Sequence, residues 1–278
     1  MSTGEQGRSA PQPITPAKFW LKSALVIVAV GILLAWAWTT SGPKEPVYQG
    51  KPMGEWLKVY VASEGDKVAQ AESAGALRKI GTNGIPTLLR MIQASDSPLR
   101  TKLQAWADKQ FFFEPNFATA EGIQRKAMFG FSILGEDAKG AVPELIALAK
   151  KPSGTTGRDW VIPALGCIGP PAKAAVPALL AIASDAKDPD RREAISALGD
   201  IHASPELVVP FLESCLRDSD MFIRYFAVTA LSQFGEDAKS SVPALIALLA
   251  DPAEFVRMHS TNALKRIDRE AATKSGIP

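Results

Sequence analysis

The stretch "FGEDAKSSVPALIALLAD" at residues 234–251 decides the fold, because the chain writes almost the same phrase more than once. Residues 134–151 read "LGEDAKGAVPELIALAKK". Two weaker copies lie between them, "CIGPPAKAAVPALLAIASD" at 167–185 and "DIHASPELVVPFLESCLRD" at 200–218, so that successive copies follow every 33 or 34 residues. A fixed period in the thirties without strand signals predicts an α-helical solenoid.

Each copy predicts a pair of helices joined by a turn. Before the turn, apolar side chains recur at helical spacing, as from Ala227 through Leu231 to Phe234. A glycine then suits a left-handed C-terminal cap, and a proline lies near the start of the second helix, where its missing N–H costs nothing. We expect an all-α, right-handed α-solenoid of about five helix pairs with a terminal half repeat. The turn positions are Gly81, Gly135, Gly169 and Gly235, with His202 and Asp268 replacing glycine, and Pro86, Pro143, Pro177, Pro210 and Pro243.

A third pattern lies in the first helices, where arginine recurs every 33 residues. Three of these four arginines follow an aspartate by six. Together with "AVPAL", this pattern resembles HEAT repeats, in the variety named for phycobilin lyases, over about residues 66–270. The resemblance implies a ladder of hydrogen bonds between the aspartates and arginines of successive repeats. Gln124 takes the arginine position in one copy and departs from it. The ladder residues are Asp185, Asp218, Asp251, Arg158, Arg191, Arg224 and Arg257.

The N-terminal region predicts a membrane anchor. Residues 23–38, "SALVIVAVGILLAWAW", carry no charge, and with their flanks they reach the ~20 residues that a bilayer helix needs. Trp20 and Trp38 lie near the two ends of the span, where interfacial aromatic residues belong. The expected segments are a disordered cytoplasmic tail at 1–18, a transmembrane signal anchor at 19–41, a linker at 42–52, the solenoid at 53–272 and a C-terminal tail at 273–278.

The basic residues Arg8, Lys18 and Lys22 precede or begin the span, and the positive-inside rule then places the N-terminus in the cytoplasm. We expect a single-pass protein whose repeats lie outside the cytoplasm, as in a bacterial inner membrane facing the periplasm. A cleaved signal peptide is the alternative, because "AWA" at 35–37 offers a small-x-small site. The apolar run exceeds the ~7–15 residues of a signal-peptide core, which favours the anchor.

Two segments lie outside the repeat pattern. Residues 53–62 predict a helix with Trp56 and Leu57 on one face, which caps the first repeat. The opening "YQGKPMGEWL" after the anchor also resembles a group of bacterial membrane-anchored HEAT-repeat proteins without an assigned function. An insertion at about 95–118 is rich in aromatic residues, which either bury an enlarged repeat or contact a partner. These residues are Trp106, Phe111, Phe112, Phe113 and Phe117.

Charge and motifs narrow the function. Residues 48–278 hold 27 basic and 27 acidic residues, so they lack the positive footprint that nucleic-acid binding requires. The two cysteines, Cys167 and Cys215, and the two histidines lack metal-ligand spacing, and no nucleophile motif is visible. We expect no catalytic residue, cofactor or metal, with Cys167 partly exposed and Cys215 in the core.

The expected function is a non-enzymatic, membrane-tethered scaffold that binds a protein or peptide partner. The resemblance leaves two enzymatic alternatives, a lyase and a HEAT-like DNA glycosylase, and a purely structural envelope protein is a further alternative. The second helices are expected to expose small side chains, either for a partner or because they line a crowded concave face. These side chains are Ala147, Ala181, Ser214 and Ala247.

Overall fold

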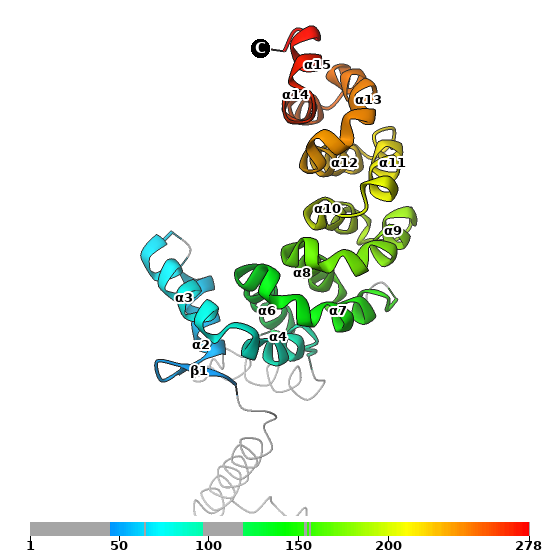
Figure 1. Ribbon diagram of the computed structural model, residues 1–278. Coiled ribbons are helices and arrows are strands. Elements are labelled where there is room, and N and C mark those ends of the chain that lie inside the picture. The colour runs from blue at the N-terminus through cyan, green and yellow to red at the C-terminus, as the bar shows by residue number, and fades with distance from the viewer. Residues whose placement is uncertain (1–44, 64, 97–118, 153–154, 156, 278) are drawn as a thin grey trace, which may run out of the picture. The chain divides into compact units, whose positions relative to one another are not determined.

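A computed structural model describes residues 45–63, 65–96, 119–152, 155 and 157–277. The chain divides into two compact units, residues 1–44 and 45–278, and every described residue belongs to the second. This unit is an α-solenoid of stacked helix pairs (Figure 1), which confirms the predicted class. The expected anchor at 19–41 and the five aromatic residues of the insertion lie outside the described residues. Within the described ranges, no helix is long and apolar enough to cross a membrane.

The unit opens with a short hairpin in the segment expected to be a linker. Strand β1 (Val47–Tyr48) pairs antiparallel with β2 (Lys51–Pro52). Gln49 and Gly50 between them have φ of 50° and 76°, the positive values that a two-residue hairpin turn requires. The linker prediction is therefore wrong for residues 47–52, because the glycine that suggested a linker closes a tight turn.

Helix α2 (Met53–Ala62) follows the hairpin at once. Trp56 and Leu57 are buried, and the Trp56 indole N–H donates to the carbonyl oxygen of Tyr48 at 3.1 Å. The Tyr60 ring lies 5.7 Å from that of Phe129 in a later helix. These contacts join the hairpin and α2 to the first repeats.

The remaining helices form pairs, and from α6 onward the first helix of each pair carries the ladder position. In the described part of the chain, the pairs are α3 (Lys67–Ile80) with α4 (Ile85–Ile92), α6 (Ala120–Leu134) with α7 (Val142–Ala149), α8 (Arg158–Ile168) with α9 (Val176–Ser184), α10 (Arg191–Ile201) with α11 (Pro205–Cys215), and α12 (Met221–Phe234) with α13 (Val242–Ala247), followed by α14 (Glu254–Ile267) and α15 (Arg269–Lys274). Short 3-10 helices lie at Gly81–Gly84, Gly135–Ala141, Pro170–Ala175, Gly235–Ser241 and Leu248–Ala250.

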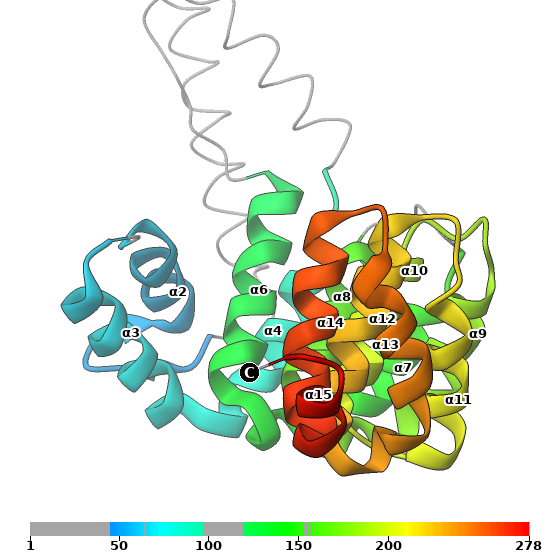
Figure 2. The ribbon, with the colours of Figure 1, turned by 90° about the horizontal axis from the view of Figure 1, so that it is seen from above.

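The two helices of a pair occupy different layers of the curved stack. Helices α6, α8, α10, α12 and α14 form the inner layer, on the concave side, and α7, α9, α11 and α13 form the outer layer (Figure 1). The view along the stack in Figure 2 also shows α9 and α11 on one side and α14 on the other. A single apolar core lies between the layers, with Leu165, Leu198 and Leu231 fully buried at equivalent positions of three inner helices.

The glycine turns differ from the expected left-handed cap. Gly135 and Gly235 have φ of 51° with ψ of −127°, and Gly169 has φ of 74° with ψ of −147°. These ψ values lie outside the left-handed helical region, because the chain turns directly into a 3-10 helix instead of closing a Schellman motif. Only the replacement residue His202, with φ of 47° and ψ of 52°, adopts the conformation expected for the turn.

Four of the five repeated prolines lie in the first turn of an outer helix, as predicted. Pro86, Pro143, Pro177 and Pro243 occupy one of the first two helical positions. Pro210 lies inside α11 instead, because that helix already begins at Pro205 and no 3-10 turn precedes it. The prediction for Pro210 is therefore wrong.

The C-terminal residues pack on the last repeat. Asp268 has an extended backbone, and its side chain caps α15 by accepting from the Ala271 N–H. Ile277 is buried, and its N–H donates to the carbonyl oxygen of Ala272 at 3.1 Å. The expected tail at 273–278 thus contributes to the core through Ile277.

Candidate functional site

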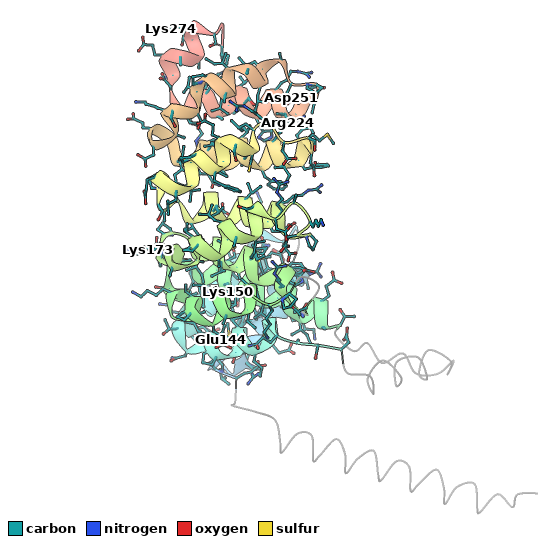
Figure 3. All side chains as sticks on the ribbon, turned by 90° about the vertical axis from the view of Figure 1, so that its right-hand side faces the viewer. Glu144, Lys150, Lys173, Arg224, Asp251 and Lys274 are labelled. Carbon is teal, nitrogen blue, oxygen red and sulfur yellow. The ribbon has the colours of Figure 1, made fainter. Side chains whose placement is uncertain are left out.

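The ladder residues meet at one edge of the solenoid, where each outer helix turns into the next inner helix. The Arg191 guanidinium lies 2.7 Å from the Asp218 carboxylate of the following repeat. Arg224 donates to both carboxylate oxygens of Asp251, at 2.7 and 2.9 Å, and Figure 3 shows this pair at the edge. The arginine holds the pKa of the Asp251 carboxyl below its usual value through these hydrogen bonds. The structure thus brings together two of the expected pairs.

The pairing of Arg158 differs from the expected one. Its guanidinium lies 2.7 Å from Asp188 and 2.8 Å from Asp190, whereas Asp185 is exposed. Helix α10 begins at Arg191, three residues after Asp188, and α12 begins three residues after Asp218. Because α10 starts one turn later relative to the repeat, Asp188 takes the place that the period assigned to Asp185. The ladder prediction for Asp185 is therefore wrong.

The side chain at the ladder position also holds the end of the preceding outer segment. The Arg158 Nε–H donates to the Ala149 carbonyl oxygen at 3.0 Å, and that of Arg191 donates to Ala183 at 2.9 Å. Arg257 donates to the Asp251 carbonyl oxygen at 2.6 Å. Gln124 serves the same purpose without a charge, because its Nε2 donates to the Ala94 carbonyl oxygen at 2.6 Å. These contacts satisfy helix-end carbonyls and assign the row a structural role.

The surface of the inner helices is the candidate functional site. On α12 and α14, aromatic rings pack side by side, with Tyr225 4.7 Å from His259 and 5.4 Å from Phe255 between ring centroids. Beside them, Phe222 and Met258 are 40% and 54% exposed, which is high for large apolar side chains. Sequence reasoning missed this cluster, although its members recur at equivalent positions of two successive inner helices.

An ion pair lies on this surface between α10 and α12. The Arg192 guanidinium lies 2.6 Å from the Asp220 carboxylate and 4.6 Å from the centre of the Phe222 ring. Both contacts stabilise a guanidinium, one by ion pairing and the other by cation–π attraction. The hydrogen bond from Arg192 lowers the pKa of the Asp220 carboxyl. At this step, an arginine on α10 therefore contacts the first turn of α12.

Between α8 and α10, four carboxyl groups lie near one guanidinium. Asp159, Asp188, Asp190 and Glu193 all act electrostatically on one another or on Arg158, the one guanidinium among them. Burial, together with the neighbouring carboxylates and against the attraction of Arg158, raises the pKa of Asp190 to about 6. Asp188 and Asp190 are largely buried against Arg158, whereas Asp159 is exposed.

Buried acceptor atoms without donors gather on the same helices. Among the described residues, the buried side-chain atoms without a hydrogen bond are Asp190 Oδ2, Glu193 Oε2, Gln233 Oε1 and Ser260 Oγ. Asp190 Oδ2 still has its ion pair with Arg158 at 2.8 Å, but Glu193 and Gln233 have no partner for these oxygens. Unpaired buried acceptors are costly to a fold.

Gln233 belongs to a hollow at the other end of the inner helices. A cavity of about 450 Å³ is lined by Cys167, Asp200, His202, Gln233 and Arg266, and its edges include Gly166 and Gly199. The Gln233 Nε2 donates to Asp200 Oδ1 at 2.9 Å, while burial raises the pKa of that carboxyl. The lining of this hollow is polar and includes both a carboxylate, Asp200, and a basic side chain, Arg266.

The cysteines do not have the character of nucleophiles. Burial raises the pKa of both the Cys167 and the Cys215 thiol, whereas a reactive cysteine needs a lowered pKa. Cys167 is partly exposed and Cys215 is buried, as predicted, and both are free. In the part of the chain that the structure describes, no three His, Cys, Asp or Glu side chains gather as ligands for a metal ion.

The small side chains of the second helices lie on the opposite side of the molecule. Ala147, Ala181, Ser214 and Ala247 are all exposed, as expected. Their helices form the outer layer, however, and therefore do not line the concave side (Figure 1). The explanation from crowding on a concave face is wrong, because the inner layer lines the concave side.

Comparison with known families identifies the repeats. Residues 176–265 match the family model of HEAT repeats. These residues are similar to HEAT repeats, over less than half of the chain. The predicted resemblance is confirmed, and the matched HEAT repeats run from α9 into α14. No curated protein matches the chain.

Solved structures with a similar fold share little sequence with these HEAT repeats. The complex of CpcE and CpcF of phycocyanin lyase from Nostoc sp. PCC7120 is 19% identical, with a TM-score of 0.45 over 84% of this chain and 85% of that chain. A designed armadillo repeat protein in complex with a peptide is 16% identical, with a TM-score of 0.44 over 78% and 100%. An engineered protein is also 16% identical, with a TM-score of 0.45 over 79% and 99%.

Proposed function

We propose that the protein is a non-enzymatic scaffold whose right-handed solenoid binds a polypeptide partner along the inner layer of its HEAT repeats. The observation that carries this proposal is the surface of α12 and α14, which exposes the large apolar side chains of Phe222 and Met258. Large apolar side chains anchor protein interfaces. Helical-repeat proteins commonly use such extended concave surfaces for binding.

The proposal includes a membrane tether, which rests on the charge-free apolar run at residues 23–38 and on the basic residues before it. With the N-terminus in the cytoplasm, the repeats face a partner outside it. A reporter that is active only outside the cytoplasm, fused after Pro278, should then be active. Activity of a cytoplasmic reporter alone at that position would contradict the tether.

Crosslinking in the native membrane tests the binding function. The full chain is treated with a lysine-reactive crosslinker in its own membrane, and the joined peptides are identified by mass spectrometry. We expect adducts with a limited set of polypeptides, whose attachment sites border the inner layer. The absence of any polypeptide adduct, with the protein shown to be folded, would contradict the proposal.

A further inference from the structure

A basic cavity lies where α14 meets α15, at the end of the stack away from α4 (Figure 1). The cavity has a volume of about 330 Å³. Asp268 has an extended backbone and separates the two helices, so that side chains of both helices border one cavity. Its lining residues come from the end of α14, from α15 and from the segment that follows, and they are Lys265, Arg269, Ala272, Thr273 and Ile277.

The lining has an apolar part and a polar part. Ala272 and Ile277 are buried and supply the apolar part. Lys265, Arg269 and Thr273 are exposed, so their polar groups are accessible to a ligand. The Thr273 hydroxyl donates to the Arg269 carbonyl oxygen at 3.0 Å, and its oxygen is therefore left to accept a hydrogen bond from a ligand.

No carboxylate neutralises the two cations of this cavity. Among the described residues, the side chains of Lys265 and Arg269 form no ion pair, and the cavity lining contains no acid. The acids nearby in the sequence are engaged elsewhere, since Asp268 accepts from the Ala271 N–H and Glu270 pairs with Lys274 at 2.6 Å. An anion from outside the chain would therefore meet two positive charges and no competing carboxylate in the lining.

We propose that this cavity binds a phosphate monoester whose alcohol part carries a free hydroxyl group. The guanidinium of Arg269 is a planar fork that matches two phosphate oxygens, and the Lys265 ammonium adds a second positive charge. A phosphate monoester carries a charge of about −1.5 to −2 at neutral pH, which balances two cations. A carboxylate, with a single negative charge, balances only one.

The size and the remaining lining favour an ester over a bare phosphate ion. A volume of about 330 Å³ lies within the ~300–1,000 Å³ of small-molecule sites, so the cavity has room for an attached polyol. The oxygen of Thr273 accepts from a hydroxyl group of that polyol, and Ala272 and Ile277 contact its carbon atoms. Either a soluble polyol phosphate or a lipid headgroup has this chemistry.

The cavity is separate from the proposed polypeptide surface. Phe255 and Met258 lie in the first half of α14, whereas Lys265 lies in its last turn. The inference therefore goes beyond the proposed function, and the failure of either one would leave the other standing.

Phosphorus NMR tests the inference on the full chain in an uncharged detergent. The protein is titrated into glycerol 3-phosphate, and the change in the phosphorus shift measures the affinity. We expect saturable binding, and Lys265→Gln together with Arg269→Gln should weaken it by at least about tenfold, because the variant loses both charges. Both side chains are exposed and unpaired, and the melting temperature establishes that this variant is folded.

A control variant separates a site from unspecific attraction. Lys139→Gln together with Lys173→Gln removes the same amount of charge from exposed positions of two 3-10 helices, and Figure 3 labels Lys173. This variant should bind glycerol 3-phosphate as the wild type does. Equal weakening by both double variants, or equally tight binding of inorganic sulfate, would overturn the inference.

A matched lipid identifies the source of the ligand. Octanoyl lysophosphatidate carries the same phosphate monoester and a free hydroxyl group, and it adds an acyl chain. Tighter binding of this lipid, again lost in the Lys265→Gln and Arg269→Gln variant, would support a lipid headgroup as the ligand. Equal or tighter binding of glycerol 3-phosphate would support a soluble ester. Absence of binding by both compounds would overturn the inference.

Discussion

At the scale of the residue, the ladder shows how one position serves two tasks. The side chain there always donates to a carbonyl oxygen at the end of the preceding outer segment, whether it is arginine or Gln124. Only an arginine at this position also forms an ion pair with a carboxylate of the next repeat, as Arg191 and Arg224 do. The sequence predicts that second partner for Arg191 and Arg224, but not for Arg158, since the late start of α10 depends on the whole "DAKDPD" turn.

Removing Arg224 tests the energetic side of the ladder. Its partner Asp251 is 6% exposed, so that Arg224→Ala leaves a buried carboxylate short of its donors. We expect the free energy of unfolding to fall by about 1–3 kcal/mol, measured by urea denaturation. Arg257→Ala is the control, because Arg257 donates only to backbone carbonyl oxygens, and its loss should be smaller. Equal losses would contradict a role for the ion pair.

The raised pKa of Asp190 predicts a dependence of stability on pH. Because its pKa is about 6 in the folded protein and near 3.8 when unfolded, the folded state holds the proton more tightly. The stability that this group contributes is then lost as the pH rises from about 4 through 6. Asp190→Asn mimics the protonated form. The melting temperature of this variant minus that of the wild type should therefore increase as the pH rises over this range. A difference that stays constant with pH would contradict the assignment.

At the scale of the element, close contact between inner helices depends on glycine and alanine. A Cβ built on Gly199 of α10 would lie 2.7 Å from Ala230 Cα of α12, and one on Gly166 would lie 3.2 Å from Ala197 Cα. Smaller side chains between the inner helices let that layer pack more closely, and the stack curves toward it.

A pair of alanine substitutions separates this contact from helix propensity. Gly199→Ala should lower the free energy of unfolding by about 1–3 kcal/mol, because the new methyl group overpacks the α10–α12 contact. Gly75→Ala, in the middle of α3 with nothing within 4 Å of the new Cβ, should raise it by up to about 1 kcal/mol. Thermal and urea denaturation measure both. A stabilising effect of Gly199→Ala would show that the helices do not approach as closely as described.

At the scale of the whole molecule, the period predicts the solenoid and its two layers but not which layer is concave. The repeats "AVPALLAIASD" and "RREAISALGDI" both carry apolar stripes, and the curve depends on three-dimensional contacts such as that of Gly199. Because the period does not show which layer is concave, the exposed small residues of the outer helices suggested a binding surface. The aromatic positions of the inner helices recur in only two successive repeats, and each acidic position is a single residue of a repeat whose neighbours vary, so neither stood out in the sequence.

The most direct test of the account is photo-crosslinking from each layer in the native membrane. A photoreactive amino acid is placed at Ser196 on the inner helix α10, or at Ala181 on the outer helix α9, where both side chains are accessible to solvent. If the inner layer binds a polypeptide, a discrete adduct should form from position 196 and be absent from position 181. An adduct from position 181 alone, or equal adducts from both positions, would contradict the central claim.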